Sequence, residues 1–279
     1  MSIRTIGRSI WNNPGNRGRR IQKLFAAVAW QADKRLLNRR RSIRLANGIR
    51  FCAYPDCVIS SALHYADWPE FNELQFCRRS LARGQVVIDV GANVGHFSLL
   101  LADVVGPENL ICFEPSPVAW ARLVENFRLN GWPTSRVYHS AVGSAQGVVD
   151  FPATDSPETT NSIAWNTKAS VMTTVELITL DSIAEPLRRV SVGLLKIDVE
   201  GYETEVFEGS HHFLDAIRPR LILFESLGGR LDSKIKGILD RHDYEVFQLD
   251  SAGTPEVALL DAQNLFAVPQ ESASEFQLR

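Results

Sequence analysis

One segment constrains the fold of this chain more than any other: an apolar run that leads directly into a glycine-rich loop. The run is Val86–Val90, and the loop after it reads Gly91-Ala92-Asn93-Val94-Gly95. A run that is apolar on both faces is typical of a strand buried in a parallel sheet. A glycine loop between such a strand and a helix is a common ligand-binding turn in doubly wound α/β folds. This segment therefore predicts the first strand, the first helix and one wall of a ligand site.

The rest of the chain alternates strands and helices as a parallel sheet requires. Further strands are expected at 110–113, 136–139, 192–197 and 220–224, with a terminal pair at 244–249 and 265–268. Helices are expected at 96–105 and 117–130, and Ser116 with Pro117 forms a helix start of the usual kind. This alternation predicts an α/β fold that is Rossmann-like and doubly wound, with a mostly parallel seven-stranded sheet and a basic helical N-terminal extension.

The first 50 residues differ sharply in charge from the rest. They contain 13 Lys and Arg and one acid, Asp33, whereas the other 229 residues contain 17 Lys and Arg and 31 acids. Apolar residues at helical spacing between 21 and 37 predict a basic amphipathic helix. A basic head on an acidic body favours one of two arrangements: the head packs on the body, or it binds an anionic partner.

For the anionic partner, the sequence offers a membrane surface. Apolar side chains that could insert shallowly stand next to a run of arginines, a combination that suits peripheral membrane contact. The apolar group is Leu24, Phe25, Val28 and Trp30, and the arginines are Arg35, Arg39, Arg40, Arg41 and Arg44. Packing of the head on the acidic body is the equally weighted alternative.

Three segments are expected along the chain: a basic extension at 1–57, a Rossmann-like domain at 58–270 and a flexible tail at 271–279. No apolar run approaches the ~20 residues of a membrane helix, and residues 24–30 lack the cleavage site of a secretory signal. The four cysteines show no C-x-x-C spacing, which indicates reduced thiols. Together these features predict a cytoplasmic protein, membrane-peripheral if the head binds lipid.

The glycine loop indicates which kind of ligand the domain binds. Gly91 would let the chain turn sharply after the strand, and Gly95 would let the helix start approach a ligand closely. Asp89 stands at the strand end, where its charge would repel the pyrophosphate of a dinucleotide. The same carboxylate suits a ligand with an ammonium group, such as the methionine part of S-adenosylmethionine.

The next two strands end in residues that would complete such a site. Glu114 ends the second strand, where an acid can accept hydrogen bonds from both ribose hydroxyls. The small residues at 140–143 leave room for a flat adenine at the end of the third strand. The expected cofactor-binding residues are Asp89, Gly91, Asn93, Gly95, Glu114, Ser140 and Ala141.

Acidic residues follow the fourth and fifth strands and are the catalytic candidates. Asp198 and Glu200 follow the fourth strand, and Glu225 follows the fifth. Asp198 could orient or deprotonate a hydroxyl nucleophile. Asp198 with Glu200 or Glu225 could instead hold a divalent cation, so the base and the metal requirement stay open. Glu200 also has a structural interpretation as a helix cap, and Lys196 as the partner of an acid.

Several blocks together resemble the FkbM-type methyltransferase family over about residues 58–227. They are residues 89–95, 113–115, 141–143, 179–181 and 195–203, and the Lys-Ile-Asp-Val-Glu-Gly-Tyr-Glu block at 196–203 is the most distinctive. The resemblance implies S-adenosylmethionine as cofactor and O-methylation of hydroxyls on sugars, glycolipids, glycans or polyketides. It also implies an acceptor-facing loop at Ala153–Ser170.

Two alternative functions remain at this point. An RNA ribose methyltransferase would use the basic head for phosphate contacts, but the body is acidic and lacks interleaved aromatic and basic residues. An inactive cofactor-binding scaffold is at odds with the intact set of Asp89, Glu114 and Asp198. The fourth strand is followed neither by an Asn/Asp-Pro-Pro-aromatic motif nor by a Pro-Cys nucleophile, which argues against methylation of nucleic-acid amino groups and of cytosine C5. The oligomeric state is open.

Overall fold

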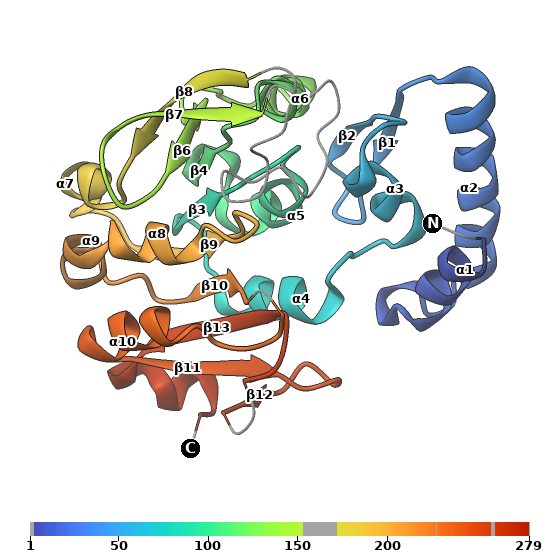
Figure 1. The fold of residues 1–279 in the computed structure, drawn as a ribbon. Helices are drawn as coiled ribbons and strands as arrows, with labels where there is room; N and C mark the ends of the chain where they lie inside the picture. The colour runs from blue at the N-terminus through green and yellow to red at the C-terminus, as the bar shows by residue number, and fades with distance from the viewer. Residues whose placement is uncertain (1–2, 153–171, 227, 258–259, 279) are drawn as a thin grey trace.

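A twisted central sheet with helices on both faces organises the molecule (Figure 1). The computed structural model describes residues 3–152, 172–226, 228–257 and 260–278. The strands of this sheet are β3 (Val86–Val90), β4 (Leu110–Phe113), β5 (Val137–Tyr138), β9 (Val192–Ile197), β10 (Ile222–Glu225), β11 (Tyr244–Leu249), β12 (Pro255–Glu256) and β13 (Asn264–Pro269). Their order is β12-β11-β13-β10-β9-β3-β4-β5. The run from β10 to β5 is parallel, and β13 is antiparallel to both of its neighbours.

The predicted Rossmann-like α/β class and all seven predicted strands are confirmed. The strand count is corrected, because β12 adds an eighth strand to the described part of the sheet. Its two residues pair with Gln248 and Leu249 at the edge next to β11. Two half-buried residues, one of them a proline, give no strand pattern in a sequence, so only pairing with β11 defines this strand.

Each face of the sheet carries its own apolar core, because neighbouring residues of a strand point to opposite sides. Val87 packs with α4 (Phe71–Ser80), α5 (His96–Val105) and α6 (Pro117–Leu129). Val86, Ile88 and Val90 pack on the other face with α8 (Glu203–Glu208), α9 (His211–Ala216) and α10 (Ser233–Arg241). The short elements η3 (Pro107–Asn109), η4 (Asp181–Ile183) and α7 (Ala184–Leu187) complete the connections. Burial on both faces explains why β3 reads as an apolar run.

A second, three-stranded sheet stands beside the end of β5. It consists of β6 (Ser140–Val142), β8 (Met172–Ile178) and β7 (Gly147–Pro152) in the order β6-β8-β7. β6 follows β5 after one residue and pairs in parallel with β8 instead of continuing in the main sheet. The expected acceptor-facing loop at 153–170 lies outside the described residues.

The basic N-terminal segment forms a helical arm against one side of the domain (Figure 1). It contains α1 (Ile3–Asn12), η1 (Pro14–Asn16), α2 (Arg20–Ala32) and the π-helical turn η2 (Asp33–Leu37). The hairpin of β1 (Arg41–Arg44) and β2 (Arg50–Ala53) and the helix α3 (Val58–Tyr65) connect this arm to α4. The predicted helix at 21–37 and the turn at Asn47-Gly48 are therefore present, and Ile6, Ile10 and Trp30 join the same apolar core as Val87.

The C-terminal segment also packs instead of fraying, although the sequence suggests a flexible tail. Residues Gln270–Phe276 form η5, and Ala273 and Phe276 are buried. The four cysteines are free and buried, as expected for reduced thiols. A search of the described helices finds none with the length and apolar character that crossing a bilayer requires.

Candidate functional site

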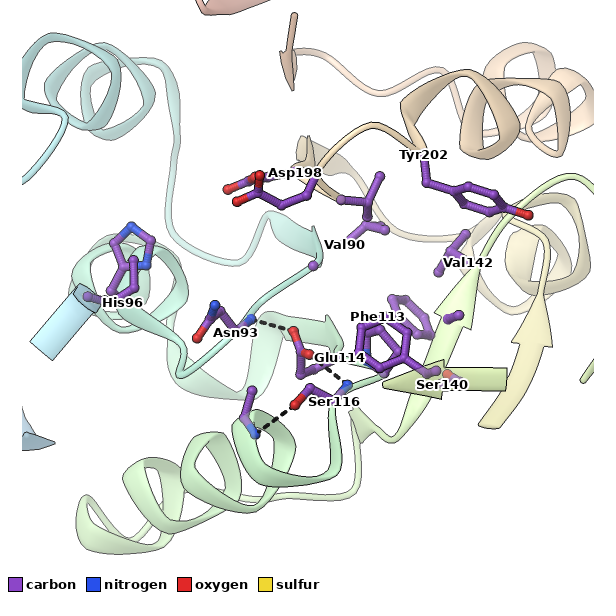
Figure 2. Close-up of a pocket in the computed structure, with 18 residues that line it drawn as sticks. Val90, Asn93, His96, Phe113, Glu114, Ser116, Ser140, Val142, Asp198 and Tyr202 are labelled. Atoms are coloured by element: carbon purple, nitrogen blue, oxygen red, sulfur yellow. Dashed lines mark hydrogen bonds between the residues drawn. The ribbon is translucent and has the colours of Figure 1, made fainter. Parts of the chain in front are cut away.

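A pocket opens at the carboxyl ends of β3, β4 and β9, next to β6 (Figure 2). In a doubly wound sheet this edge is where ligands bind, because the strand order reverses there. The predicted site residues in its lining are Gly91, Asn93, Glu114, Ser140, Ala141, Asp198 and Glu200. Three predicted residues lie outside the lining: Asp89, Gly95 and Glu225.

Glu114 lies at the centre of the pocket and organises the loops around it (Figure 2). Its carboxylate accepts hydrogen bonds from the backbone N–H of Asn93 at 2.7 Å and from that of Ser116 at 2.8 Å. Ser116 in turn accepts a hydrogen bond from Ala119 N at 3.3 Å, which is the predicted cap of α6. Burial raises the pKa of Glu114 to about 7, although the two N–H donors oppose that shift. Each carboxylate oxygen retains a lone pair for a ligand hydroxyl.

Gly91 is required where β3 meets the end of β9. Its φ is +76°, a value that non-glycine residues rarely adopt. A Cβ at this position would overlap the carbonyl oxygen of Asp198. The glycine therefore permits both the turn after β3 and the close approach of the strand that carries Asp198, which confirms its predicted turn and adds a packing role.

Asp89 is buried beneath the pocket, not exposed to a ligand as its place in the sequence suggests. Its carboxylate accepts a hydrogen bond from Ser98 Oγ at 2.6 Å and pairs with Lys196 Nζ at 3.2 Å. Lys196 is also buried and pairs with Asp198 Oδ2 at 3.1 Å. Asp89 thus acts on the pocket through Lys196, which holds the Asp198 carboxylate in place.

Gly95 serves the packing of two helices. Its φ is +87°, and a Cβ there would overlap Leu123 of α6 and crowd Leu99 of α5. The expected approach of this glycine to a ligand is not what the structure shows, because Gly95 faces α6 and does not line the pocket. The sequence motif is the same for both roles, so only the packing of α5 on α6 distinguishes them.

The pocket end next to β6 is lined mainly by apolar and aromatic side chains. Ser140 and Ala141 lie there with Phe113, Val142 and Tyr202, as Figure 2 shows for the labelled members. Tyr202 also packs against Gly143, where a Cβ would meet its ring at 2.9 Å. The apolar walls suit a planar ring. Tyr202 belongs to the block at 196–203, but the sequence does not indicate that its side chain lines the pocket.

The opposite end of the pocket is acidic. Asp198, Glu200 and Glu225 each place a carboxylate oxygen within 4.8 Å of the others, a spacing at which they could share a metal ion. Glu225 accepts a hydrogen bond from Gln263 Nε2 at 2.7 Å on Oε1, while its buried Oε2 has no hydrogen-bond partner in the described residues. Burial, followed by the charges of Glu225 and Asp198, raises the pKa of Glu200 to about 7. Glu225 thus belongs to this carboxylate cluster although it does not line the pocket.

The loop that carries Asp198 and Glu200 is held by Glu203. The Glu203 carboxylate accepts hydrogen bonds from Val199 N at 3.0 Å and from Gly201 N at 3.0 and 3.2 Å, at the start of α8. The helix-cap role considered for Glu200 thus falls to Glu203, three residues further on. Glu200 itself adopts φ +53° and has no ion-pair or hydrogen-bond partner in the described residues, which leaves its carboxylate available.

His96 is a pocket residue that the sequence analysis did not single out. It is the first residue of α5, and neither ring nitrogen has a hydrogen-bond partner in the described residues. Its Nε2 lies 3.7 Å from Glu70 Oε1, and Figure 2 shows the ring on the same side of the pocket as Asp198. The sequence does contain one signal for His96. It directly follows Gly95, and the first turn of the helix after a glycine loop borders the ligand site.

The other histidines have structural partners. His64 stacks on Trp30 with 4.2 Å between ring centroids, and His139 stacks on Trp120 and contacts Pro115 O at 3.0 Å. His211 contacts His242 at 2.8 Å, away from the pocket lining.

Comparison with known proteins gives a family match and a curated relative. The profile of the Methyltransferase FkbM domain matches residues 89–246. The hexuronic acid methyltransferase AglP of Haloferax volcanii is 29% identical over 134 residues, which cover 47% of this chain and 52% of that protein. This chain thus spans about half the length of that curated relative.

Solved structures add likeness at low identity. The methyltransferase FkbM from Methylobacillus flagellatus is 15% identical, with a TM-score of 0.44 over 75% of this chain and 54% of that one. Trm5b from Pyrococcus abyssi is 17% identical, with a TM-score of 0.40 over 82% of this chain and 54% of that one. Neither likeness bears on the substrate.

Proposed function

Because the chain belongs to the FkbM methyltransferase family, we propose that it transfers a methyl group from S-adenosylmethionine to a hydroxyl of a sugar, glycolipid, glycan or polyketide-type small molecule. One observation carries this proposal. A single pocket joins the Glu114 carboxylate and an end lined by apolar and aromatic side chains to the carboxylates of Asp198, which Lys196 holds, and Glu200, which has no partner in the described residues. A nucleoside-binding half and a proton-accepting half thereby share one cavity.

The nucleoside half fits S-adenosylmethionine. Glu114 keeps acceptor capacity for ribose hydroxyls, and the walls at Ser140 and Ala141 suit an adenine ring. The Asn93 Oδ1 atom is buried without a hydrogen-bond partner in the described residues, so it is available to a ligand amine or hydroxyl. When bound, the cofactor supplies an electrophilic methyl group on a positively charged sulfur, which the acidic pocket end favours electrostatically.

In the proton-accepting half, we assign different roles to two carboxylates. Lys196 holds Asp198 at 3.1 Å and is itself held by Asp89, so Asp198 is fixed and suited to orient the acceptor hydroxyl. Glu200 has no cation partner within ion-pair distance in the described residues, and it can accept the hydroxyl proton. His96 with Glu70 stands on the same side of the pocket and is the competing base.

The curated relative supports a sugar as the acceptor. Its name assigns it a hexuronic acid, which is a sugar with several ring hydroxyls and one carboxylate. The carboxylates of Asp198, Glu200 and Glu225 would repel the carboxylate of such a sugar, so we expect that group to point away from them. Free hexuronic acids, neutral hexoses and glycolipid extracts are therefore the acceptors to compare.

A divalent cation is a second way to activate the hydroxyl. The spacing of Asp198, Glu200 and Glu225 and the unpartnered Oε2 of Glu225 support it, since Mg²⁺ and Mn²⁺ take carboxylate ligands. Turnover that falls after chelation and returns with Mg²⁺ or Mn²⁺ would establish this mechanism. Turnover that is indifferent to chelator leaves the carboxylates as proton acceptors.

Two measurements test the proposed function. Isothermal titration with S-adenosylmethionine and S-adenosylhomocysteine should show binding of both. Transfer of labelled methyl groups to the acceptor panel should then produce a base-stable methyl ether, as O-methylation of a hydroxyl requires. If neither S-adenosylmethionine nor S-adenosylhomocysteine binds, the cofactor assignment is refuted. If the product is a base-labile methyl ester, the methyl acceptor is a carboxylate and the assignment of a hydroxyl is refuted.

A further inference from the structure

The outward face of α2 is apolar, the reverse of what a water-exposed helix surface normally shows. Ile21, Phe25 and Val28 stand at helical spacing and are 67%, 73% and 69% exposed. Leu36 and Leu37 lie in η2, which follows α2 directly, and are also exposed. We call these five residues the α2 row.

The fold does not need the α2 row for packing. The opposite face of α2 holds the helix in place, because Trp30 is buried, stacks on His64 of α3 and donates a hydrogen bond to Ser61 Oγ at 3.1 Å. This placement corrects the expected insertion of Trp30 into lipid, and Leu24 is likewise partly buried against the core. Apolar side chains therefore occur on both faces of α2, and only one set is covered by the described residues.

Basic residues border the α2 row, and only some of them are neutralised. Arg40 pairs with Glu125 at 2.8 Å and Arg41 pairs with Asp33 at 2.5 Å, so part of the arginine run docks on its own protein. Lys34, Arg35 and Arg39 have no ion-pair partner in the described residues. Arg40 thus packs the head on the body, Arg41 pairs within the head, and Lys34, Arg35 and Arg39 remain available to an anionic partner.

A groove of about 220 Å³ lies between α2 and α3 next to the row. Lys34 and Arg35 line it together with Tyr65, whose hydroxyl accepts a hydrogen bond from Gln31 and keeps its own proton for a ligand, whereas the Ser61 hydroxyl already donates to Cys57 O. Ammonium and guanidinium groups beside hydroxyls are the donors that bind phosphate oxygens. The groove therefore complements an anionic headgroup, just as the row beside it complements acyl chains.

We propose that the α2 row and the bordering cations dock on an anionic phospholipid bilayer. The row would insert at the boundary between headgroups and acyl chains, a depth of ~5–10 Å that amphipathic helices reach without spanning the membrane. Lys34, Arg35 and Arg39 would lie at the headgroups, where each cation adds attraction that salt screens.

Two helices separate the docked membrane from the pocket. The outward face of α2 carries the row, and α3 lies behind it: its Ser61 and His64 hold Trp30 of α2, and its Ile59 lines the pocket (Figure 1). If the proposed function holds, docking would keep the enzyme at the surface that carries a lipid-linked acceptor. Docking itself needs no methyl transfer, so the two proposals can fail separately.

Flotation of the full chain with vesicles tests the docking. Phosphatidylcholine vesicles that contain phosphatidylglycerol should carry the wild type upward at low salt, and pure phosphatidylcholine vesicles should carry little. Phe25→Ser with Val28→Ser should reduce the bound-to-free ratio by at least about tenfold, because two inserted side chains are lost. Lys34→Glu with Arg35→Glu should reduce it similarly at low salt and less at high salt.

Matched controls stand far from α2. Val148→Ser removes an apolar side chain that is 72% exposed on β7, and Arg189→Glu reverses an exposed charge beyond α7. Both should float like the wild type. Cofactor titration on every variant confirms that the domain is folded and separates loss of docking from loss of the proposed function.

Two kinds of result would overturn the proposal. The first comes from flotation: either the wild type does not float with anionic vesicles, or the α2 variants float as well as the controls. The second comes from analytical ultracentrifugation: if the wild type is a dimer and Phe25→Ser with Val28→Ser is a monomer, a second copy of the chain covers the row.

Discussion

Replacing Glu114 with glutamine is the sharpest test of the nucleoside half of the pocket. The glutamate carboxylate accepts the N–H groups of Asn93 and Ser116, one on each oxygen, at 2.7 and 2.8 Å. A glutamine keeps one acceptor oxygen and turns an NH₂ group toward the other N–H donor. The substitution preserves size but removes the charge and half of the acceptor capacity.

The expected loss of cofactor affinity follows from this geometry. Hydrogen bonds to a charged, buried acceptor contribute ~1.5–3 kcal/mol each, which corresponds to roughly 10- to 150-fold in the dissociation constant. Isothermal titration with S-adenosylhomocysteine measures the change without turnover. Because Glu114 is buried, solvent screening should not reduce the effect.

The same residue predicts a pH dependence of stability in the ligand-free protein. Burial raises the pKa of Glu114 from 4.5 to about 7, so the folded state binds its proton more tightly than the unfolded state. The contribution of Glu114 is therefore fully present below about pH 4.5 and is lost as the pH rises through about 7. In thermal melts over this range, Glu114→Gln should lose less stability with rising pH than the wild type.

Asp232→Asn is the control for Glu114→Gln. The Asp232 carboxylate also accepts two backbone N–H groups, those of Lys234 at 2.7 Å and Ile235 at 3.3 Å, and it lies outside the pocket. Its change to an amide should leave cofactor affinity as it is. Unaltered affinity in a folded Glu114→Gln variant would show that Glu114 only ties the loops together.

Four further substitutions test the pocket lining and the buried pair of Asp89 and Lys196. Gly91→Ala should destabilise the fold by ~3 kcal/mol or more in urea titrations, because its Cβ would overlap the Asp198 carbonyl oxygen and its φ is positive; an unchanged midpoint would contradict this. Asp89→Asn should cost ~3 kcal/mol of unfolding free energy, because it removes one partner of the buried Lys196 ammonium; a loss of cofactor affinity without a loss of stability would instead indicate direct ligand contact. Glu200→Gln should lower kcat ~100-fold or more at unchanged cofactor affinity if Glu200 accepts the proton. Asp198→Asn should lower kcat/KM for the acceptor by a similar factor, because Asp198 orients the acceptor hydroxyl. Near-normal turnover of either variant would remove that residue from the mechanism.

Local signals in the sequence were sufficient for the fold and for part of the site. The apolar run at β3 identifies a strand buried on both faces, and Ser116 with Pro117 marks the start of α6, because burial and capping act over a few neighbouring residues. Gly91 was predictable for the same reason, since a positive φ is a property of one residue. Glu114 at the end of the second strand needed only the rule that ligands bind at that edge.

What a side chain contacts across the molecule was decided by the tertiary structure. Asp89 reads as a ligand contact, yet a lysine 107 residues away occupies its carboxylate. Gly95 reads as a ligand approach, yet Leu123 of another helix fills the space where a Cβ would stand.

The N-terminal helix shows the same division. Its apolar spacing predicts a helix but does not say which apolar residues are covered, because α3 supplies the cover for Trp30 and leaves Phe25 in solvent. A periodic pattern is a property of the helix alone, whereas burial depends on neighbours that are distant in the chain. The sequence by itself therefore determined the elements and the turn chemistry, and only the packing of those elements decided which polar groups are paired, which glycines serve packing and which apolar face remains free.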